Sequence, residues 1–280
     1  GRLDEIPSRE GGTMDLGKLA EGLQRGETGW VALMAANNET GAIQPCGQCA
    51  DLARGHGALS FCDASQWFGK KPAREAIAFG DVVVGSGHKF GGPKGSGFVV
   101  FGERVADITL QTGGPQEHGH RAGTEDLPAI AAMVAALAEA EGTLKRFAEQ
   151  APLRDTFEAE LQRRIPGTFS VAADADRLAN TAMVVVPKER NLKWLTRLGR
   201  RGFSISTGSA CSSGAENGSH VLAAMGVPAD TIDRSLRISS GSGHRADDWA
   251  ALVDAFETVW GEIGSDRDHS RKPTLDLGAL

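Results

Sequence analysis

The chain has 280 residues, of which 40% are hydrophobic and 24% charged, a composition typical of a globular protein with one large or two ordinary domains. Its 30 Lys and Arg residues against 36 Asp and Glu residues give a net charge of −6, without a basic block that would indicate a nucleic-acid partner. The longest apolar stretch, near residues 128–138, is too short to span a bilayer, and no secretory signal opens the chain, so we expect no membrane partner. Four cysteines are too few for a disulfide scaffold and favour a cytoplasmic location.

The first half of the chain alternates apolar runs with helical patterns. Four runs predict strands, at residues 30–34, 59–62, 82–84 and 98–101. A helix is expected after Pro45, because Cys46, Cys49, Ala50 and Ala53 fall at i, i+3, i+4 and i+7. Both cysteines of this CxxC pattern lie on the apolar face, which favours core packing over a metal or redox role, and we predict no metal site. The alternation predicts an α/β fold, a mostly parallel sheet with flanking helices.

The second half of the chain predicts a smaller α+β domain. Asp126 is expected to cap a long helix that runs to about Gln150, and a second helix follows at residues 153–165. Further strands are predicted near residues 182–186, 203–206 and 236–239, and a last helix near 246–263. We therefore expect a large domain at residues 1–144 and a small C-terminal domain at 145–280.

Polar side chains follow three neighbouring strands of the predicted sheet. Open α/β sheets bind ligands beyond the carboxyl ends of their strands, so a site is expected there. The side chains that follow the three strands in turn are Asn37 and Asn38, then Asp63 and Gln66, then Ser86, His88 and Lys89.

Lys89 lies in a glycine-rich turn, where a lysine can hold an aldehyde cofactor as a Schiff base instead of being a solvated surface charge. Small neighbours let the backbone approach a flat ligand, and the hydroxyl of Ser86 and the imidazole of His88 suit a phosphate. Asp63 is the natural partner of Lys89, because a carboxylate beside such a cofactor keeps a pyridine nitrogen protonated. The alternative for Asp63 is a turn or helix-capping residue.

Two further residues are candidates in the second half. Cys211 lies among small residues, Ser209-Ala210-Cys211-Ser212-Ser213, which favours a mobile nucleophile over a core cysteine. Arg237 interrupts an apolar strand; it either binds a substrate carboxylate or lies exposed on an edge strand.

At this point the chain resembles the cysteine desulfurases of the NifS/IscS type, which belong to the class V aminotransferase superfamily of fold-type I pyridoxal-phosphate enzymes. The matching segments occur in the family's order. They are residues 36–45, 63–66, 86–89, 92–95, 121–124, 209–213 and 236–239.

The resemblance implies an enzyme that converts L-cysteine to L-alanine and leaves a persulfide on Cys211, for donation to an acceptor protein in iron–sulfur cluster, nitrogenase or tRNA-thiolation biosynthesis. Lys89 would carry pyridoxal 5'-phosphate and later move protons. Asp63 would pair with the ring nitrogen and Gln66 with the ring oxygen. Ser86 and His88 would bind the phosphate, and Thr124 would bind the phosphate of the partner subunit in a homodimer. Asn38 would contact the cofactor, and Asn38 and Arg237 would hold the substrate carboxylate.

The residues also allow three other hypotheses about function. A selenocysteine lyase or another class V pyridoxal enzyme would share the cofactor but not the need for Cys211. A truncated paralogue that acts only as a binding module would bind no cofactor. A Cys–His hydrolase would need His88 or His220 near Cys211. The family's N-terminal part is absent from this sequence, so we expect the large domain to be incomplete at its N-terminus.

Overall fold

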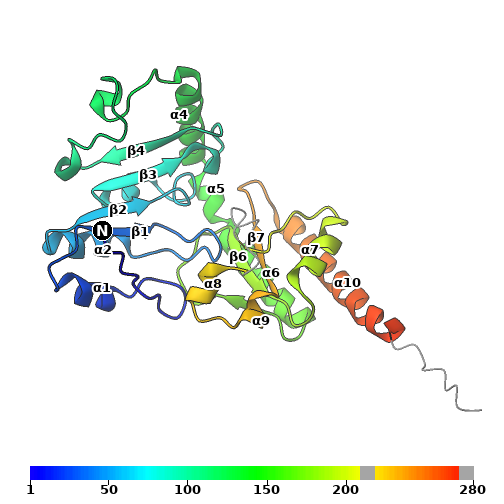
Figure 1. Ribbon diagram of the computed structural model, residues 1–280. Coiled ribbons are helices and arrows are strands. Elements are labelled where there is room, and N and C mark those ends of the chain that lie inside the picture. Colours follow the sequence, from blue (N-terminus) through cyan, green and yellow to red (C-terminus); the bar gives the residue numbers. More distant parts are fainter. Residues whose placement is uncertain (209–217, 271–280) are drawn as a thin grey trace, which may run out of the picture. The chain divides into compact units, whose positions relative to one another are not determined.

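The computed structural model describes residues 1–208 and 218–270, and these residues form two compact units (Figure 1). Unit 1 comprises Gly1–Ala151, Ala172–Thr181 and Ser240–Gly243. Unit 2 comprises the described parts of Pro152–Val171, Ala182–Ser239 and His244–Leu280. Each unit therefore combines stretches that are far apart in the sequence.

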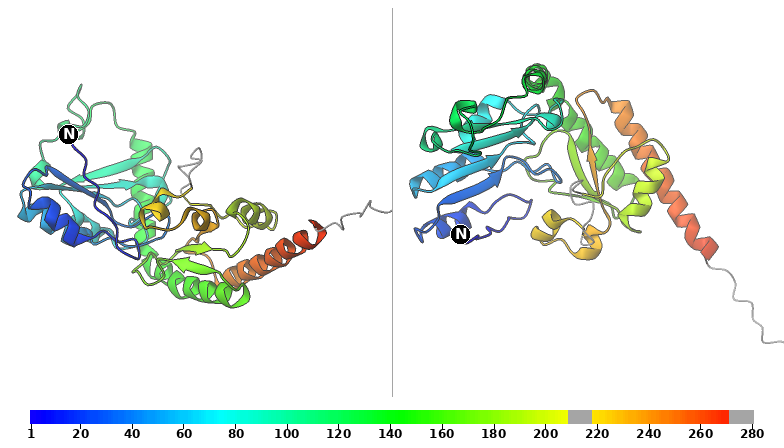
Figure 2. Two further views of the ribbon diagram at one scale, coloured as in Figure 1. Left: turned by 60° about the horizontal axis from the view of Figure 1, so that its bottom comes forward. Right: turned by 45° about the horizontal axis from the view of Figure 1, so that its top comes forward.

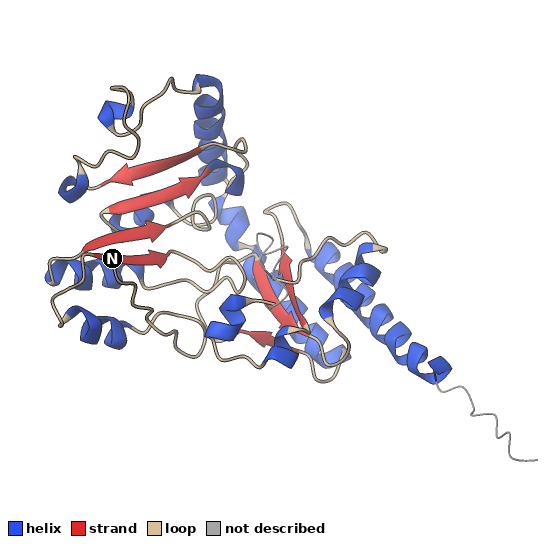
Figure 3. Cartoon of the chain, viewed as in Figure 1, coloured by secondary structure: helices blue, strands red, loops and turns tan. Residues whose placement is uncertain are grey.

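Unit 1 contains a four-stranded sheet in the order β1-β2-β3-β4 (Figure 3). The strands are β1 (Trp30–Met34), β2 (Leu59–Asp63), β3 (Val82–Ser86) and β4 (Gly97–Phe101). Strands β1, β2 and β3 run parallel, and β4 pairs antiparallel with β3. The four predicted strands and the mostly parallel sheet are thus confirmed. Strand β1 lies at the edge of this sheet, where Trp30 is 46% exposed while Val31 is buried.

Two helices pack together beside β1 and β2 (Figure 2). The predicted helix is α2 (Cys46–Gly55), and its buried residues are the four that the periodicity selected, Cys46, Cys49, Ala50 and Ala53. The other helix, α1 (Leu16–Leu23), was not predicted. Asp15 caps it by accepting hydrogen bonds from the backbone N–H groups of Gly17 and Lys18. Its Leu19 and Leu23 join Cys49 and Ala53 in one apolar cluster.

A second apolar cluster lies between the sheet and α4 (Leu127–Gly142), which runs beside β3 and β4 (Figure 1). Asp126 caps α4 as predicted, since its Oδ1 accepts from the backbone N–H of Ala129. The prediction of one helix to Gln150 is wrong: α4 ends at Gly142, and α5 (Leu144–Ala148) and α6 (Gln150–Arg164) follow. The break lies at Thr143, whose φ of −109° is not helical and whose hydroxyl donates to the carbonyl of Ala140.

Unit 2 is built around the sheet β5-β6-β7, with strands β5 (Phe169–Val171), β6 (Thr181–Val185) and β7 (Ser235–Ser239). The helices α7 (Asn191–Gly199), α8 (His220–Ala224), α9 (Ala229–Ile232) and α10 (Ala246–Ser270) complete it. Phe157, Trp194 and Phe256 are fully buried at its centre. The predicted strand at 203–206 is wrong, because only Ser206 pairs, through two backbone hydrogen bonds with Arg237.

Short helical turns connect these elements in unit 1. They are α3 (Ala73–Ala76), η1 (Ile77–Phe79), η2 (Gly87–Lys89), η3 (Glu103–Val105) and η4 (Glu117–Gly119). Within the described residues no single helix has the length and apolar character needed to cross a membrane; a pair bent by 62°, 127–142 with 144–164, meets that test by length and composition alone.

Candidate functional site

The register of the parallel strands brings three predicted segments to one edge of the sheet in unit 1. Met34 of β1 lies opposite Asp63 of β2, and Asp63 lies opposite Val84 of β3. The segments that leave these strands carry Asn38, then Asp63 and Gln66, then Ser86 to Lys89. Carboxyl ends of parallel strands form the ligand-binding edge of open α/β sheets.

Asp63 is the last residue of β2, and its side chain is exposed at this edge. Its Oδ1 accepts a hydrogen bond of 2.9 Å from the backbone N–H of Ser65. This bond fixes the carboxylate in a turn and leaves its other oxygen available. Asp63 does not cap a helix, because the segment after it is a turn that continues to Lys71.

Lys89 is exposed at the end of the short helical turn η2, directly after β3. The loop is closed by two backbone hydrogen bonds of 2.9 Å, from the N–H of Gly87 to Ser96 and from the N–H of Gly92 to Gly87. A Cβ at position 87 would lie 2.5 Å from the Oγ of Ser96 and 3.2 Å from its carbonyl oxygen, so a larger residue there would disturb the loop. A rigid turn therefore presents the lysine amine. In the same segment, Ser86 Oγ and His88 Nδ1 are 2.9 Å apart, within hydrogen-bond distance.

Lys70, in the turn after β2, was not among the residues predicted from the sequence. Its Nζ donates to the Oε1 of Gln66 at 3.2 Å. Burial, together with the positive charge of Lys89, lowers the pKa of Lys70 to about 8. The only sequence feature that points to Lys70 is its position: it lies four residues after Gln66 and directly follows Gly69, which comes after two aromatic residues.

Asn38 and Thr124 lie on two other segments of unit 1. The turn around Asn38 is organised by Asn37, whose Oδ1 accepts from the backbone N–H groups of Glu39 and Thr40 at 2.9 and 3.0 Å. Asn38 itself is half-buried. Thr124 is exposed, two residues before the cap of α4.

The last two predicted residues belong elsewhere in the chain. Arg237 is half-buried on β7 of unit 2, where its backbone pairs with that of Ser206. Cys211 lies outside the described residues.

The other three cysteines, Cys46, Cys49 and Cys62, are buried in unit 1, and core packing was predicted for the first two. Cys46 Sγ and Cys62 Sγ are 3.6 Å apart, and this contact together with burial raises the pKa of Cys46. Burial raises the pKa of Cys49 to about 11. These thiols are poor nucleophiles near neutral pH. Within residues 1–208 and 218–270, no three His, Cys, Asp or Glu residues are grouped as metal ligands would be.

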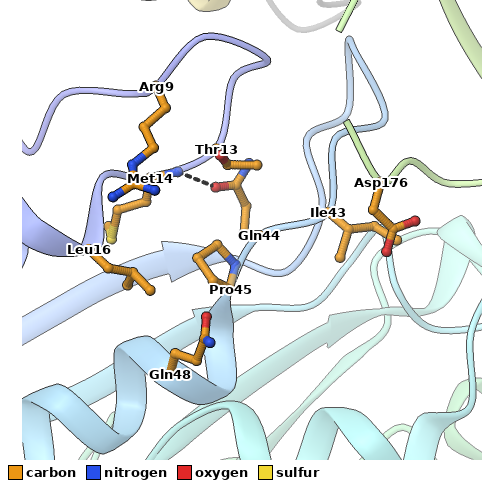
Figure 4. Close-up of a pocket in the computed structure, with 9 residues that line it drawn as sticks. All are labelled: Arg9, Thr13, Met14, Leu16, Ile43, Gln44, Pro45, Gln48 and Asp176. Carbon is orange, nitrogen blue, oxygen red and sulfur yellow. Dashed lines mark hydrogen bonds between the residues drawn. The ribbon is translucent and has the colours of Figure 1, made fainter. Parts of the chain in front are cut away.

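A separate shallow pocket of about 320 Å³ lies near α1 and the start of α2 (Figure 4). Its central polar side chain, Gln44, already accepts from the N–H of Met14 at 2.9 Å and donates to the carbonyl of Gly12 at 2.8 Å. Gln44 therefore holds backbone, and none of the predicted site residues is among the nine that line the pocket. These nine are Arg9, Thr13, Met14, Leu16, Ile43, Gln44, Pro45, Gln48 and Asp176.

Known proteins resemble this chain in sequence and in structure. "Cysteine desulfurase 2" of Trichormus variabilis is 38% identical over 228 residues, which cover 81% of this chain and 57% of that protein. A NifS-like protein from Rickettsia africae has a TM-score of 0.80 at 27% identity, covering 91% of this chain and 69% of the other. A structure described as SspA in complex with cysteine has a TM-score of 0.67 at 26% identity, covering 84% and 65%.

These similarities confirm the predicted α/β fold and the resemblance to cysteine desulfurases, and they show that the chain spans less than two thirds of the length of the relative from Trichormus variabilis. The family model described as aminotransferase class V matches residues 1–248, a range that includes the whole edge around Asp63 and Lys89. The chain belongs to the class V aminotransferase family.

Proposed function

We propose that this chain is a pyridoxal-phosphate-dependent cysteine desulfurase, which converts L-cysteine to L-alanine and holds the sulfur as a persulfide on Cys211. One observation carries the proposal: a closed turn presents the Lys89 amine directly after β3, beside the strand that ends in the Asp63 carboxylate. Relatives named cysteine desulfurase, at 38% identity in one case, support L-cysteine as the substrate.

The residues at this edge fit each polar group of pyridoxal 5'-phosphate. An exposed amine can react with the aldehyde, a carboxylate suits the pyridine nitrogen, and a hydroxyl beside an imidazole suits the phosphate. When bound, the cofactor supplies an aldehyde that captures amines and a ring that accepts an electron pair.

Lys89 Nζ would hold the cofactor and, once the substrate amine has replaced it, carry a proton to or from the substrate. Asp63, oriented by the Ser65 N–H, would keep a proton on the ring nitrogen. Ser86 Oγ and His88 would hold the phosphate, and Gln66 would donate to the ring oxygen.

The substrate carboxylate would bind to Asn38 and Arg237. The thiolate of Cys211 would attack the sulfur of the bound cysteine, so that an S–S bond forms while the substrate's C–S bond breaks. The substrate carbon that carried the sulfur would take up a proton, and the product would leave as alanine. Cysteine and one thiol therefore yield alanine and one persulfide, and no external oxidant is consumed.

We further propose that the chain acts as a homodimer in the cytoplasm, in which Thr124 binds the phosphate of the partner subunit. The persulfide would pass its sulfur to an acceptor protein. Exposure of Thr124 in the segment before α4 supports its availability for such a contact.

A visible absorption spectrum of the chain with added pyridoxal phosphate tests this function, followed by borohydride reduction and peptide mapping. We expect a band, a label on Lys89, and alanine formation after L-cysteine is added. The variant K89A should lose the label, whereas K94A, which removes the other lysine of the same loop, should keep it. C211A should keep the band but form no persulfide.

The proposal is wrong if the purified chain shows no band and no label, or if C211A releases sulfide from cysteine at the parent rate. A band without dependence on Cys211 would favour another class V pyridoxal enzyme.

A further inference from the structure

The turn after β2 holds a lysine that the proposed function leaves unused. Backbone hydrogen bonds fix this turn: the N–H of Trp67 donates to Ala64, and the N–H groups of Lys70 and Lys71 both donate to Trp67 at 3.0 Å. The Trp67 and Phe68 side chains are 5% and 2% exposed and anchor the turn in the core. The backbone of Lys70 therefore has a fixed place.

The contact between Lys70 and Gln66 selects one orientation of the Gln66 carboxamide. Lys70 Nζ lies 3.2 Å from Gln66 Oε1. An ammonium group only donates hydrogen bonds, so it must face the oxygen of the amide and not its NH2 group. The terminal torsion of glutamine is broad and nearly two-fold, which means that the side chain alone does not choose between the two orientations. With its oxygen held by Lys70, the amide turns its donor NH2 group in the other direction.

A close backbone approach ties this turn to the Lys89 loop. Gly69 has a φ of +75°, and a Cβ on it would lie 2.6 Å from the Cβ of Phe90, the residue after Lys89. Only glycine allows both that conformation and that approach. Gln66 and Lys70 therefore lie on the segment that packs against Phe90, the residue after the proposed cofactor lysine.

The electrostatics agree with this placement. The positive charge of Lys89 is one cause of the lowered pKa of Lys70, after burial, and this requires the two amines to be near each other. Lys70 is half-buried and its amine is bonded to Gln66, whereas Lys89 is exposed. Of the two, Lys89 is available to a ligand and Lys70 supports a neighbour.

We propose that Lys70 is a positioning residue of the cofactor site: it holds the carboxamide oxygen of Gln66 so that the carboxamide NH2 donates to the anionic ring oxygen of pyridoxal phosphate. This rests on the proposed function, because it assigns the cofactor to Lys89. Lys70 acts through Gln66 and touches neither cofactor nor substrate.

Cofactor titration of the full chain tests the proposal, with the visible band as readout and peptide mapping to verify the label on Lys89. K70M should weaken pyridoxal phosphate binding by roughly tenfold, the effect of losing about one well-placed hydrogen bond. K70R, which keeps a donor, should recover most of the affinity. K71M removes the adjacent half-buried lysine and should stay within about twofold of the parent. Equal weakening by K70M and K71M would contradict a specific role, and a label on Lys70 would overturn both proposals.

A double-mutant cycle separates positioning from simple charge attraction. If Lys70 acts through Gln66, K70M has no further effect once Q66A has removed the amide. If Lys70 attracts the phosphate by its charge alone, K70M costs the same tenfold in both backgrounds, and the proposal is wrong.

A measurement without cofactor keeps the two proposals distinguishable. Competitive acetylation across pH, read by mass spectrometry, gives the titration midpoint of the Lys70 amine, expected near the pKa of about 8. Q66A should lower that midpoint, because the amide oxygen favours the charged amine. An unchanged midpoint overturns the Lys70 proposal, whether or not the parent binds pyridoxal phosphate; a parent that binds none, with the midpoint shifted, refutes the proposed function alone.

Discussion

Replacing Gly69 by alanine should destabilise unit 1 far more than the loss of an ordinary loop glycine. Two separate causes act at this position. Its φ of +75° lies in the left-handed region, and the added Cβ would meet the Cβ of Phe90 at 2.6 Å and that of Ala140 at 3.2 Å. The first contact is about 1 Å shorter than the optimum for carbon atoms, roughly 3.5–4.0 Å.

The magnitude follows from these two causes. A non-glycine residue in the left-handed region costs about 1–2 kcal/mol, offset by about 0.4–1 kcal/mol because alanine restricts the unfolded chain. Inserting a methyl group into packed surroundings adds about 1–3 kcal/mol. The sum is about 3 kcal/mol. Gly91 is the matched control, since it has a φ of +96° with nothing within 4 Å of a built Cβ. G91A should therefore cost only about 1 kcal/mol.

Hydrogen exchange across a urea series checks this, read on peptides from residues 59–101 so that unit 1 is followed by itself. The difference between the free energies of unfolding of G69A and G91A isolates the steric contribution, about 2 kcal/mol. Equal stabilities for the two variants would refute the close approach of the two turns. G69A should also weaken cofactor binding, since Phe90 must shift and Lys89 precedes it.

Three further variants or treatments test the structure of unit 1. K89M removes the charge that helps to lower the pKa of Lys70, so the acetylation midpoint of Lys70 should rise above about 8 yet stay below 10.5 because burial, the larger cause, remains; no rise would contradict the proximity of the two amines. Iodoacetamide at pH 8 should leave the raised-pKa thiols of Cys46 and Cys49 unmodified until urea is added, and their modification in the folded protein would show that the α2 face is open. D81A should lower the free energy of unfolding by about 3 kcal/mol, because Asp81 is buried and accepts hydrogen bonds from the N–H and hydroxyl of Ser60 and from Arg104. The control D51A removes an exposed carboxylate and should change it by no more than about 0.5 kcal/mol. Similar unfolding midpoints for the two variants would argue against the buried network around Asp81.

Periodicity predicted the elements whose apolar residues face one core. The four residues predicted to be buried in α2 are the four that are buried, because apolar residues that repeat every 3.6 positions lie on one face of a helix and that face packs against the core. The break at Thr143 was missed, since the apolar pattern continues through it while a side-chain hydrogen bond ends the helix. The segment 203–206 has the composition of a strand, but only Ser206 forms a β-bridge, with Arg237. Strand pairing depends on distant residues, which composition does not encode.

The sheet edge proposed as the site was predicted from the sequence, but the contacts between the loops around it were not. Placing polar residues after successive strands predicted the edge that carries Asp63 and Lys89, since parallel neighbours end together. Lys70 could not be chosen in this way, because in the sequence it is one of two adjacent lysines in a turn. The structure distinguishes it from Lys71 by the hydrogen bond from Lys70 Nζ to Gln66 Oε1.

Unit 1 is discontinuous in the chain, and this affects how the protein can fold during synthesis. Its first 151 residues are completed by residues 172–181 and 240–243. These later residues form hydrogen bonds within unit 1. The carbonyl of Asp176 accepts from the N–H of Ile43 in the first segment, and Asn180 donates to the carbonyl of Ser240.

A ribosome that adds about 5–20 residues per second needs roughly 5–20 s to make the 92 residues from 152 to 243. For that time the nascent first segment lacks the closing bonds of its own unit. The edge that carries Asp63 and Lys89 is therefore translated well before residues 240–243, which complete the unit that supports it.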